Sequence, residues 1–210
     1  SDAFVVSAEL EGETRLFLVA KDAAGLSLET LKTIDGRRAG KLTLDAVEAE
    51  LLPGSSQALL DHVLDRGAAG AVAEGVGLTQ RVLEITTEYL NTREQFGVKI
   101  GSFQVLQHRA VDMFVETQLI RAASIASSVL ADDPDPAARL EAISAAKVQL
   151  SVGGKYVTQQ SIQLHGGIGC TDEHDIGLFF KRMHALNTLY GDEAFHLRRF
   201  SASPSFAKVG

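Results

Sequence analysis

The first part of the chain, up to residue 52, consists of short apolar runs separated by turn residues. Glu11-Gly12-Glu13 lies between two of these runs and is typical of a hairpin turn. Asp35-Gly36 and Ala39-Gly40 are further turn signals. Runs of this length favour antiparallel strands, although they are too few to form a self-sufficient sandwich. The predicted strands cover residues 4–6, 16–19, 26–31 and 41–44.

From residue 53 onward, apolar residues recur at spacings of three and four, which is typical of amphipathic helices. The first predicted helix follows Leu51-Leu52-Pro53-Gly54 and runs to Arg93. The second extends from Phe103 to about Ala131. The stripe that should bury the first helix comprises Leu59, Val63, Val72, Val76, Leu83 and Tyr89.

Asp135-Pro136 predicts the start of a third helix, with the aspartate as N-cap and the proline at the first helical position. This helix ends at Gly166-Gly167. The remaining predicted segments are a helix over 175–189, a last helix from 190 or 191 to 200, and a loose tail over 201–210.

Long helices with short connections favour an up-and-down four-helix bundle. The expected fold class is therefore α+β and mainly α, with a partial antiparallel β domain over residues 1–52 and a helical-bundle domain over 53–210.

Composition and charge narrow the choice of function. The chain is 45% hydrophobic and 22% charged, as ordinary globular proteins are, and its net charge of −7 argues against a general surface for nucleic acid or anionic membrane. A single cysteine, Cys170, excludes an internal disulfide and suits a reducing compartment. No run is long and apolar enough to span a bilayer, so we expect a cytoplasmic protein.

The connection between the first two helices is rich in groups that could bind a ligand. Arg93 could donate two hydrogen bonds to a diphosphate, Phe96 or Phe103 could cover a planar ring, and Gln104 could add a hydrogen bond. The same pattern also fits a purely structural corner. In that interpretation Arg93 faces the helix dipole, Phe96 is a core residue, and the glycines at 97 and 101 cap helices.

The histidines and the cysteine give weaker signals. His165, His174, His184 and His196 could act as acids or bases, but none has the spacing of a metal ligand. Cys170 follows a glycine-rich turn and has no identified base partner. Gly166 and Gly167 would let a ligand lie against the backbone, because neither has a Cβ.

Two motifs resemble the acyl-CoA dehydrogenase family: Thr92-Arg93-Glu94-Gln95-Phe96-Gly97 with Ile100-Gly101-Ser102-Phe103-Gln104, and Gln163-Leu164-His165-Gly166-Gly167. The resemblance covers the family's C-terminal bundle and the end of its middle β domain, without its N-terminal helical domain. It implies FAD as cofactor, bound across a subunit boundary. The implied FAD contacts are Arg93, Gln95, Phe96, Phe103, Gln104, Gln163, Gly166 and Gly167.

The resemblance also implies a reaction and partners. Family members are flavoprotein oxidoreductases of fatty acid metabolism that remove an α-proton from an acyl-CoA thioester while a β-hydride passes to the flavin. Electrons continue to an electron-transfer flavoprotein. The implied assembly is a homodimer or homotetramer, or a hetero-oligomer with a related subunit.

The sequence departs from the family where the carboxylate base is expected. The usual glutamate position aligns with Gly191, in Tyr190-Gly191-Asp192-Glu193, and the alternative position aligns with Gly67. Asp192, Glu193 or Glu74 could replace the base, with Asp192 preferred. The chain could instead be a non-catalytic subunit that completes a partner's FAD site. A flavin monooxygenase on the same scaffold is a third alternative.

Overall fold

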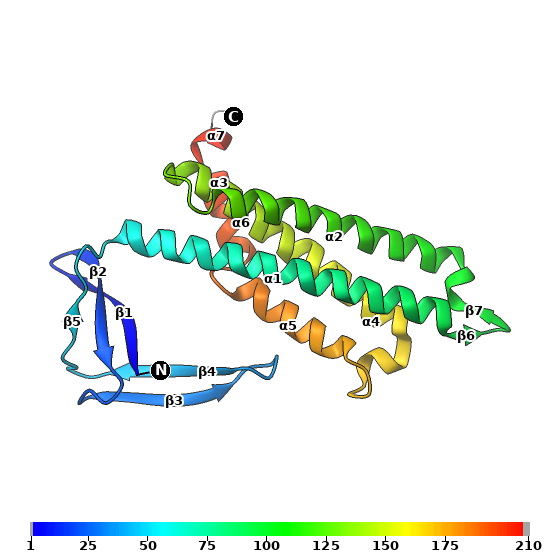
Figure 1. Ribbon diagram of the computed structural model, residues 1–210, viewed down its shortest axis with the longest axis horizontal. Coiled ribbons are helices and arrows are strands. Elements are labelled where there is room, and N and C mark those ends of the chain that lie inside the picture. The colour runs from blue at the N-terminus through cyan, green and yellow to red at the C-terminus, as the bar shows by residue number, and fades with distance from the viewer. Residues whose placement is uncertain (1, 208–210) are drawn as a thin grey trace. The chain divides into compact units, whose positions relative to one another are not determined.

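The computed structural model describes residues 2–207 and confirms the expected fold class, mainly helical with small antiparallel sheets (Figure 1). The chain divides into two compact units, Ser1–Leu64 and Asp65–Gly210. The division falls inside the longest helix, α1, which spans Gln57–Thr92. The first unit therefore holds the strands that precede α1 and the beginning of that helix, and the second holds the helical bundle.

The first unit contains two small sheets, and all four predicted strands are present. Glu11 and Gly12 both have positive φ, 54° and 82°, as a two-residue hairpin turn requires. The pairing puts Phe4 opposite Val19. A three-stranded sheet has the order β1-β2-β5, with β1 at Ala3–Leu10, β2 at Glu13–Ala20 and β5 at Glu50–Leu51. A separate hairpin pairs β3, Leu26–Lys32, with β4, Arg38–Leu44.

Few side chains of these strands are buried. Leu16 and Val19 are buried on β2, whereas Leu28, Leu31 and Ile34 are all at least 46% exposed. This unit thus exposes several apolar side chains to solvent.

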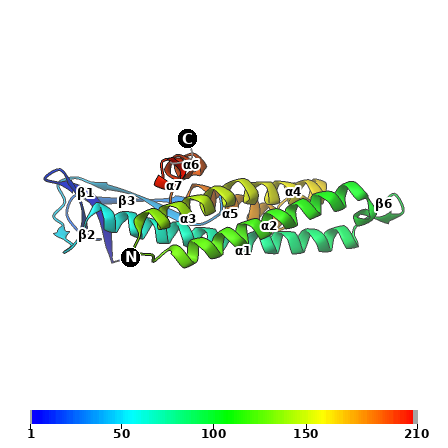
Figure 2. The ribbon, with the colours of Figure 1, turned by 90° about the horizontal axis from the view of Figure 1, so that it is seen from above.

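The second unit is the predicted bundle, in which α1, α2 and α4 lie side by side (Figures 1 and 2). The third predicted helix is continuous, but a π-helical turn at Leu150–Gly154 divides it into α3 and α4. None of the described helices combines the length and apolar character needed to cross a membrane. The other helices are α2 at Gln104–Leu130, α3 at Pro136–Gln149, α4 at Lys155–His165, α5 at Ile176–Thr188, α6 at Glu193–Ser201 and α7 at Pro204–Ala207.

The core forms where the apolar stripes of these helices meet. A Cβ at Gly75 of α1 would collide with the Leu150 side chain. Because glycine has no Cβ, the π-helical turn can pack closely against α1. The fully buried members include Val72, Val82, Met113, Ile120, Ile143, Leu150, Val157 and Leu186.

Two expectations about the helices were wrong. Leu59 and Val63 belong to the predicted stripe of α1 but are 42% and 55% exposed, because the buried face of α1 begins further along. The predicted loose tail contains the helix α7, which Pro204 can begin without losing a hydrogen bond. Ser205 N donates to the Glu141 carboxylate, 3.4 Å away. Residues 208–210 of the predicted tail lie outside the described residues.

Candidate cofactor and base site

The connection between α1 and α2 is a small hairpin. Its strands are β6, Glu94–Gln95, and β7, Val98–Lys99. Phe96 and Gly97 form the turn, with φ of 57° and 79°, so both lie in the left-handed region. The structural interpretation of this corner was therefore wrong about Gly97, which is a turn residue and caps no helix.

Gly101 is required by packing, since a Cβ there would lie 2.7 Å from the Leu90 carbonyl oxygen. It belongs to a 3₁₀ turn at Ile100–Ser102 that leads into α2. This glycine likewise does not cap α1.

The hairpin presents its side chains to solvent. Phe96 is 91% exposed, so it is not the core residue of the structural interpretation, and its ring meets Phe103 edge-on with centroids 6.2 Å apart. Arg93 and Gln104 are exposed, and neither side chain forms a hydrogen bond or an ion pair with another of the described residues 2–207. Gln95 Nε2 donates to the Glu94 carbonyl. The hairpin thus presents the exposed ring of Phe96 and the guanidinium of Arg93 close together in the sequence.

The second group of predicted contacts lies at the end of α4. Gly166 has φ 63° and ψ −139°, and its N–H donates to the Gln163 carbonyl. No atom lies within 4 Å of where a Cβ would stand on Gly166 or Gly167. Gln163 is exposed. A ligand could therefore reach the backbone of this turn directly.

The two groups lie at the same end of the bundle (Figure 1). Tyr89, one helical turn before Arg93, donates its hydroxyl hydrogen to the His165 carbonyl at 3.4 Å. His165 itself is buried, and its Nδ1 lies 2.8 Å from the Ser161 carbonyl oxygen. Burial lowers the pKa of His165, and the hydrogen bond to Ser161 opposes that shift.

Both expected base positions are closed to side chains. A Cβ on Gly67 would lie 2.5 Å from the Tyr190 ring. At Gly191, whose φ is 103°, a Cβ would collide with the Phe195 ring and lie 2.9 Å from His196 Nε2. No glutamate fits at either position without movement of these neighbours.

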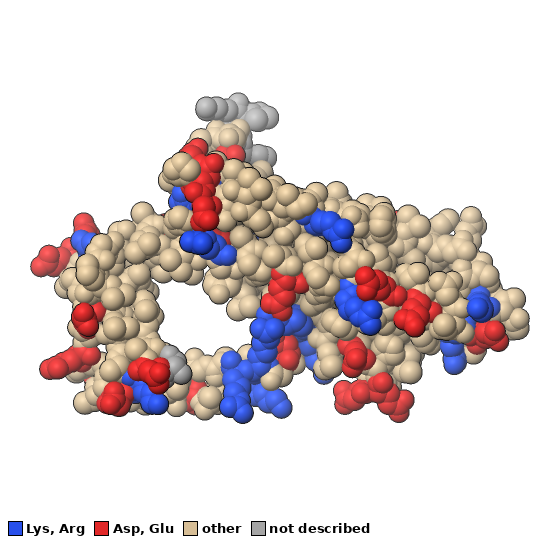
Figure 3. Space-filling view, in the orientation of Figure 1, with Lys and Arg blue, Asp and Glu red and all other residues tan. Residues whose placement is uncertain are grey.

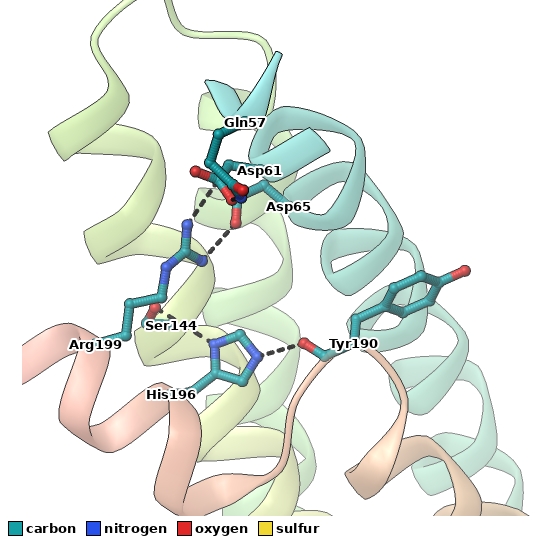
Figure 4. Close-up of polar contacts among 7 residues, drawn as sticks. All are labelled: Gln57, Asp61, Asp65, Ser144, Tyr190, His196 and Arg199. Atoms are coloured by element: carbon teal, nitrogen blue, oxygen red, sulfur yellow. Dashed lines mark hydrogen bonds and ion pairs between the residues drawn. The ribbon is translucent and has the colours of Figure 1, made fainter. Parts of the chain in front are cut away.

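The turn at Tyr190–Asp192 is held by hydrogen bonds from α3 and α6 (Figure 4). His196 is buried and its Nε2 lies 2.9 Å from the Tyr190 carbonyl oxygen, so Nε2 carries the hydrogen of that bond. Its Nδ1 then accepts from the Ser144 hydroxyl at 3.4 Å. Burial lowers the pKa of His196, although the Tyr190 hydrogen bond opposes that shift.

Two of the three candidate replacement carboxylates, Asp192 and Glu74, are engaged in other contacts. Asp192 is the N-cap of α6, and its Oδ1 accepts from Phe195 N at 2.8 Å. Glu74 accepts from Arg182 through both carboxylate oxygens, each at 2.7 Å. Glu193 is exposed in the first turn of α6.

Near Gly67, Asp65 forms a buried ion pair in which Arg199 Nη2 donates to Oδ2 at 3.0 Å (Figure 4). The Asp65 carboxylate is therefore engaged in an ion pair with Arg199, two residues before Gly67 in the sequence.

Lys147 was not singled out from the sequence. It is fully buried on α3 and its Nζ donates to the Leu186 and Leu189 carbonyl oxygens, at 2.8 and 2.7 Å. Burial lowers its pKa to about 8, and the charge of Asp192 opposes that shift. The available signal was its position four residues after Ile143, within the apolar stripe of the helix.

Comparison with known protein families shows the family of the chain. The model of the acyl-CoA dehydrogenase C-terminal domain matches residues 57–203. The chain belongs to the acyl-CoA dehydrogenase family. Among the described residues, no three histidine, cysteine or acidic side chains come together in a way that could hold a metal ion.

Similar acyl-CoA dehydrogenases are found in mycobacteria. The chain is 37% identical to the acyl-CoA dehydrogenase IpdE2 of Mycolicibacterium smegmatis over 77% of this chain and 51% of the relative. It is 38% identical to IpdE2 of Mycobacterium tuberculosis over 67% of this chain and 42% of the relative. The chain thus spans about half the length of these curated relatives.

Solved structures share the fold of the whole chain. The steroid acyl-CoA dehydrogenase Tcur3481-Tcur3483, as its G363A variant, superposes with a TM-score of 0.90 at 31% identity, over 100% of this chain and 57% of that chain. The ChsE4-ChsE5 complex of Mycobacterium tuberculosis gives a TM-score of 0.85 at 26% identity, over 96% of this chain and 55% of that chain.

Proposed function

We propose that this chain is a subunit of an FAD-dependent acyl-CoA dehydrogenase, which forms an α,β-double bond in an acyl-CoA thioester and passes the electrons to an electron-transfer flavoprotein. Its own role is to complete an FAD site, while a related partner subunit supplies the carboxylate base. Bound FAD would supply the hydride acceptor.

The residues at one end of the bundle fit the adenosine diphosphate part of FAD. The guanidinium of Arg93 suits a diphosphate, since its fork can donate two hydrogen bonds. Phe96 offers an exposed ring for stacking. Gly166 and Gly167 have no atom within 4 Å of the missing Cβ positions, so phosphate oxygens can approach the backbone. Gln95, Phe103, Gln104 and Gln163 are proposed as the neighbouring contacts.

The proposal that residues 2–207 do not supply the base rests mainly on the closure of Gly67 and Gly191. Neighbouring atoms occupy the place where a side chain would begin at each position. Asp192 is used as a helix cap, and Glu74 is paired with Arg182. A base must be within hydrogen-bond reach of the α-proton with its lone pairs available. Both carboxylates already accept hydrogen bonds within this chain, which supports a base from elsewhere.

A related partner subunit is the proposed source of the base. Two of the similar solved structures are named for a pair of proteins, the ChsE4-ChsE5 complex and Tcur3481-Tcur3483. In this chain, α2 has a second apolar face that its own bundle leaves exposed, and few charges lie over that edge in Figure 3. The exposed side chains are Val111, Phe114, Val115, Leu119, Ile125 and Val129.

Substitution of the remaining carboxylate candidates tests this role. In the assembled dehydrogenase that contains this chain, Asp192→Asn and Glu193→Gln should leave the rate of flavin reduction by acyl-CoA within about twofold of wild type. Arg93→Gln, as a positive control, should lower the fraction of FAD bound. A loss of about a hundredfold or more in Asp192→Asn, with FAD still bound, would make Asp192 the base and overturn the proposal.

A further inference from the structure

His165 comes directly before the Gly166-Gly167 turn and is 3% exposed. Its ring stacks on Tyr89 with centroids 4.4 Å apart and planes 27° apart. On another side, the His174 ring lies 4.5 Å away, tilted by 54°. The last residue of α4 is therefore held between side chains from α1 and from the connection before α5.

Hydrogen bonds fix the same residue from both ends. His165 Nδ1 lies 2.8 Å from the Ser161 carbonyl oxygen, so Nδ1 carries the hydrogen. The His165 carbonyl accepts from the Tyr89 hydroxyl at 3.4 Å. Ser161 is joined to α1 in turn, because its hydroxyl lies 2.7 Å from that of Thr86. These contacts determine where the chain leaves α4 and hence where the following N–H groups point.

We propose that His165 is a positioning residue for the diphosphate of FAD: its ring and carbonyl, clamped by Tyr89 and His174, hold the backbone of Gly166 and Gly167 in the binding conformation. This inference rests on the proposed function for the identity of the ligand. Its structural part, the ordering of the turn, stands on the contacts above.

The clamp requires a neutral imidazole. His165 Nε2 is buried and has no hydrogen-bond partner among the described residues, so a proton there would have no acceptor. His174 Nδ1 accepts a hydrogen bond from Ile176 N at 3.3 Å, so this nitrogen carries no hydrogen. Burial lowers the pKa of His165, and a positive charge on His174 lowers it further. Acid should therefore loosen the turn.

Other charged groups lie around the groove of about 420 Å³ beside this clamp. Tyr89 and His174 line the groove and contact His165 directly. The charged groups that line it are Arg81, Glu88, Glu173 and Asp175. Burial, the Ser161 hydrogen bond and His174, rather than these charged groups, shift the pKa of His165.

FAD titrations of the chain at several pH values test the proposal. In the wild type, affinity should fall between about pH 7.5 and about pH 5.5, by less than about tenfold, because the lowered pKa of His165 leaves the ring only partly protonated at the lower pH. His165→Asn keeps a donor for Ser161 but removes the ring, and it should weaken FAD binding about tenfold at about pH 7.5 and abolish the pH dependence. His165→Phe keeps the ring and removes the titrating group, so it should bind more tightly than His165→Asn and also show no pH dependence.

His184→Asn is the matched control, because His184 is an exposed histidine on α5. It should behave as the wild type in affinity and in pH profile. Circular dichroism confirms that each variant retains its helices. Unchanged affinity and an unchanged pH profile in both His165 variants would overturn the proposal.

Amide hydrogen exchange at Gly166 and Gly167 provides a readout that needs no FAD. His165→Asn should raise exchange at these two amides about tenfold relative to amides in the centre of α2, and His184→Asn should not. If the wild type binds no FAD, the cofactor part of the proposed function fails and exchange alone decides the role of His165. Equal exchange in wild type and His165→Asn would contradict that role.

Discussion

At the scale of single residues, the contacts of Gly67 and Gly191 carry the most information. The sequence shows that these positions have no carboxylate, but not that both are sterically closed. Closure depends on the Tyr190 ring, which reaches Gly67 from a turn that is distant in sequence. Tyr190 has a φ of 57°, and its carbonyl is bonded to His196. Such a contact has no sequence signature, because it joins residues through the folded bundle.

A double-mutant cycle measures the contact between Gly67 and Tyr190. In the wild-type background, the steric cost of Gly67→Ala should offset its gain in helix propensity, which is about 1 kcal/mol. In a Tyr190→Ala background the same substitution should be stabilising by about 1 kcal/mol, giving a coupling of about 1 kcal/mol in urea unfolding. Gly70→Ala is the matched control, since no atom lies within 4 Å of its missing Cβ. A coupling near zero would show that the ring does not occupy the space beside Gly67.

The buried histidines predict how stability depends on pH. The folded-state pKa values of His165 and His196 are both lowered, chiefly by burial. As pH falls below about 6.5, the unfolded chain binds protons that the folded chain does not. The free energy of unfolding should therefore be level near neutrality and fall on acidification. His196→Asn should lower stability at neutral pH and make this fall less steep, as followed by urea unfolding. An unfolding free energy that rises on acidification would contradict the burial of neutral imidazoles.

At the scale of elements, periodicity was a good guide where a helix has one buried face. The bounds of α2 and of the α3–α4 helix followed from apolar spacing and from the Asp135-Pro136 start signal. The hairpin β6–β7 could not be predicted this way, because two-residue strands have no periodicity. Phe96-Gly97 also lacks the asparagine or glycine that usually marks the first position of such a turn.

Phe96 has an unfavourable backbone conformation that stability measurements can detect. Phe96→Asn should raise the free energy of unfolding by about 0.5–1 kcal/mol, because asparagine tolerates the left-handed region better. It should also weaken FAD binding about tenfold through loss of the ring. Glu11→Asn is the matched control, since Glu11 has a φ of 54° in the first hairpin. That variant should gain similar stability and bind FAD normally. Equal FAD affinities for Phe96→Asn and wild type would remove Phe96 from the cofactor site.

At the scale of the whole molecule, two short motifs were enough to predict the family from the sequence. Which surfaces the bundle leaves exposed could be learned only from the structure. The sequence predicted a bundle, and the bundle exposes a second apolar face on α2. Few charged side chains lie along that edge in Figure 3. Periodicity predicted the face of α2 that is buried, with Met113, Thr117 and Ile120 on it, but not that the opposite apolar face stays exposed. The exposed face and the side-chain-free base positions together favour a subunit that acts within an assembly.

The central claim is that this chain holds the diphosphate end of FAD, and a visible-absorption titration of the chain with FAD tests it most directly. A saturable shift of the flavin bands is predicted. The midpoint should move about tenfold to higher FAD concentration in Arg93→Gln, because the bidentate guanidinium contact is lost. Arg38→Gln, on strand β4, is the matched control and should leave the midpoint unchanged. Absence of any shift, or equal shifts in all three proteins, would contradict the claim.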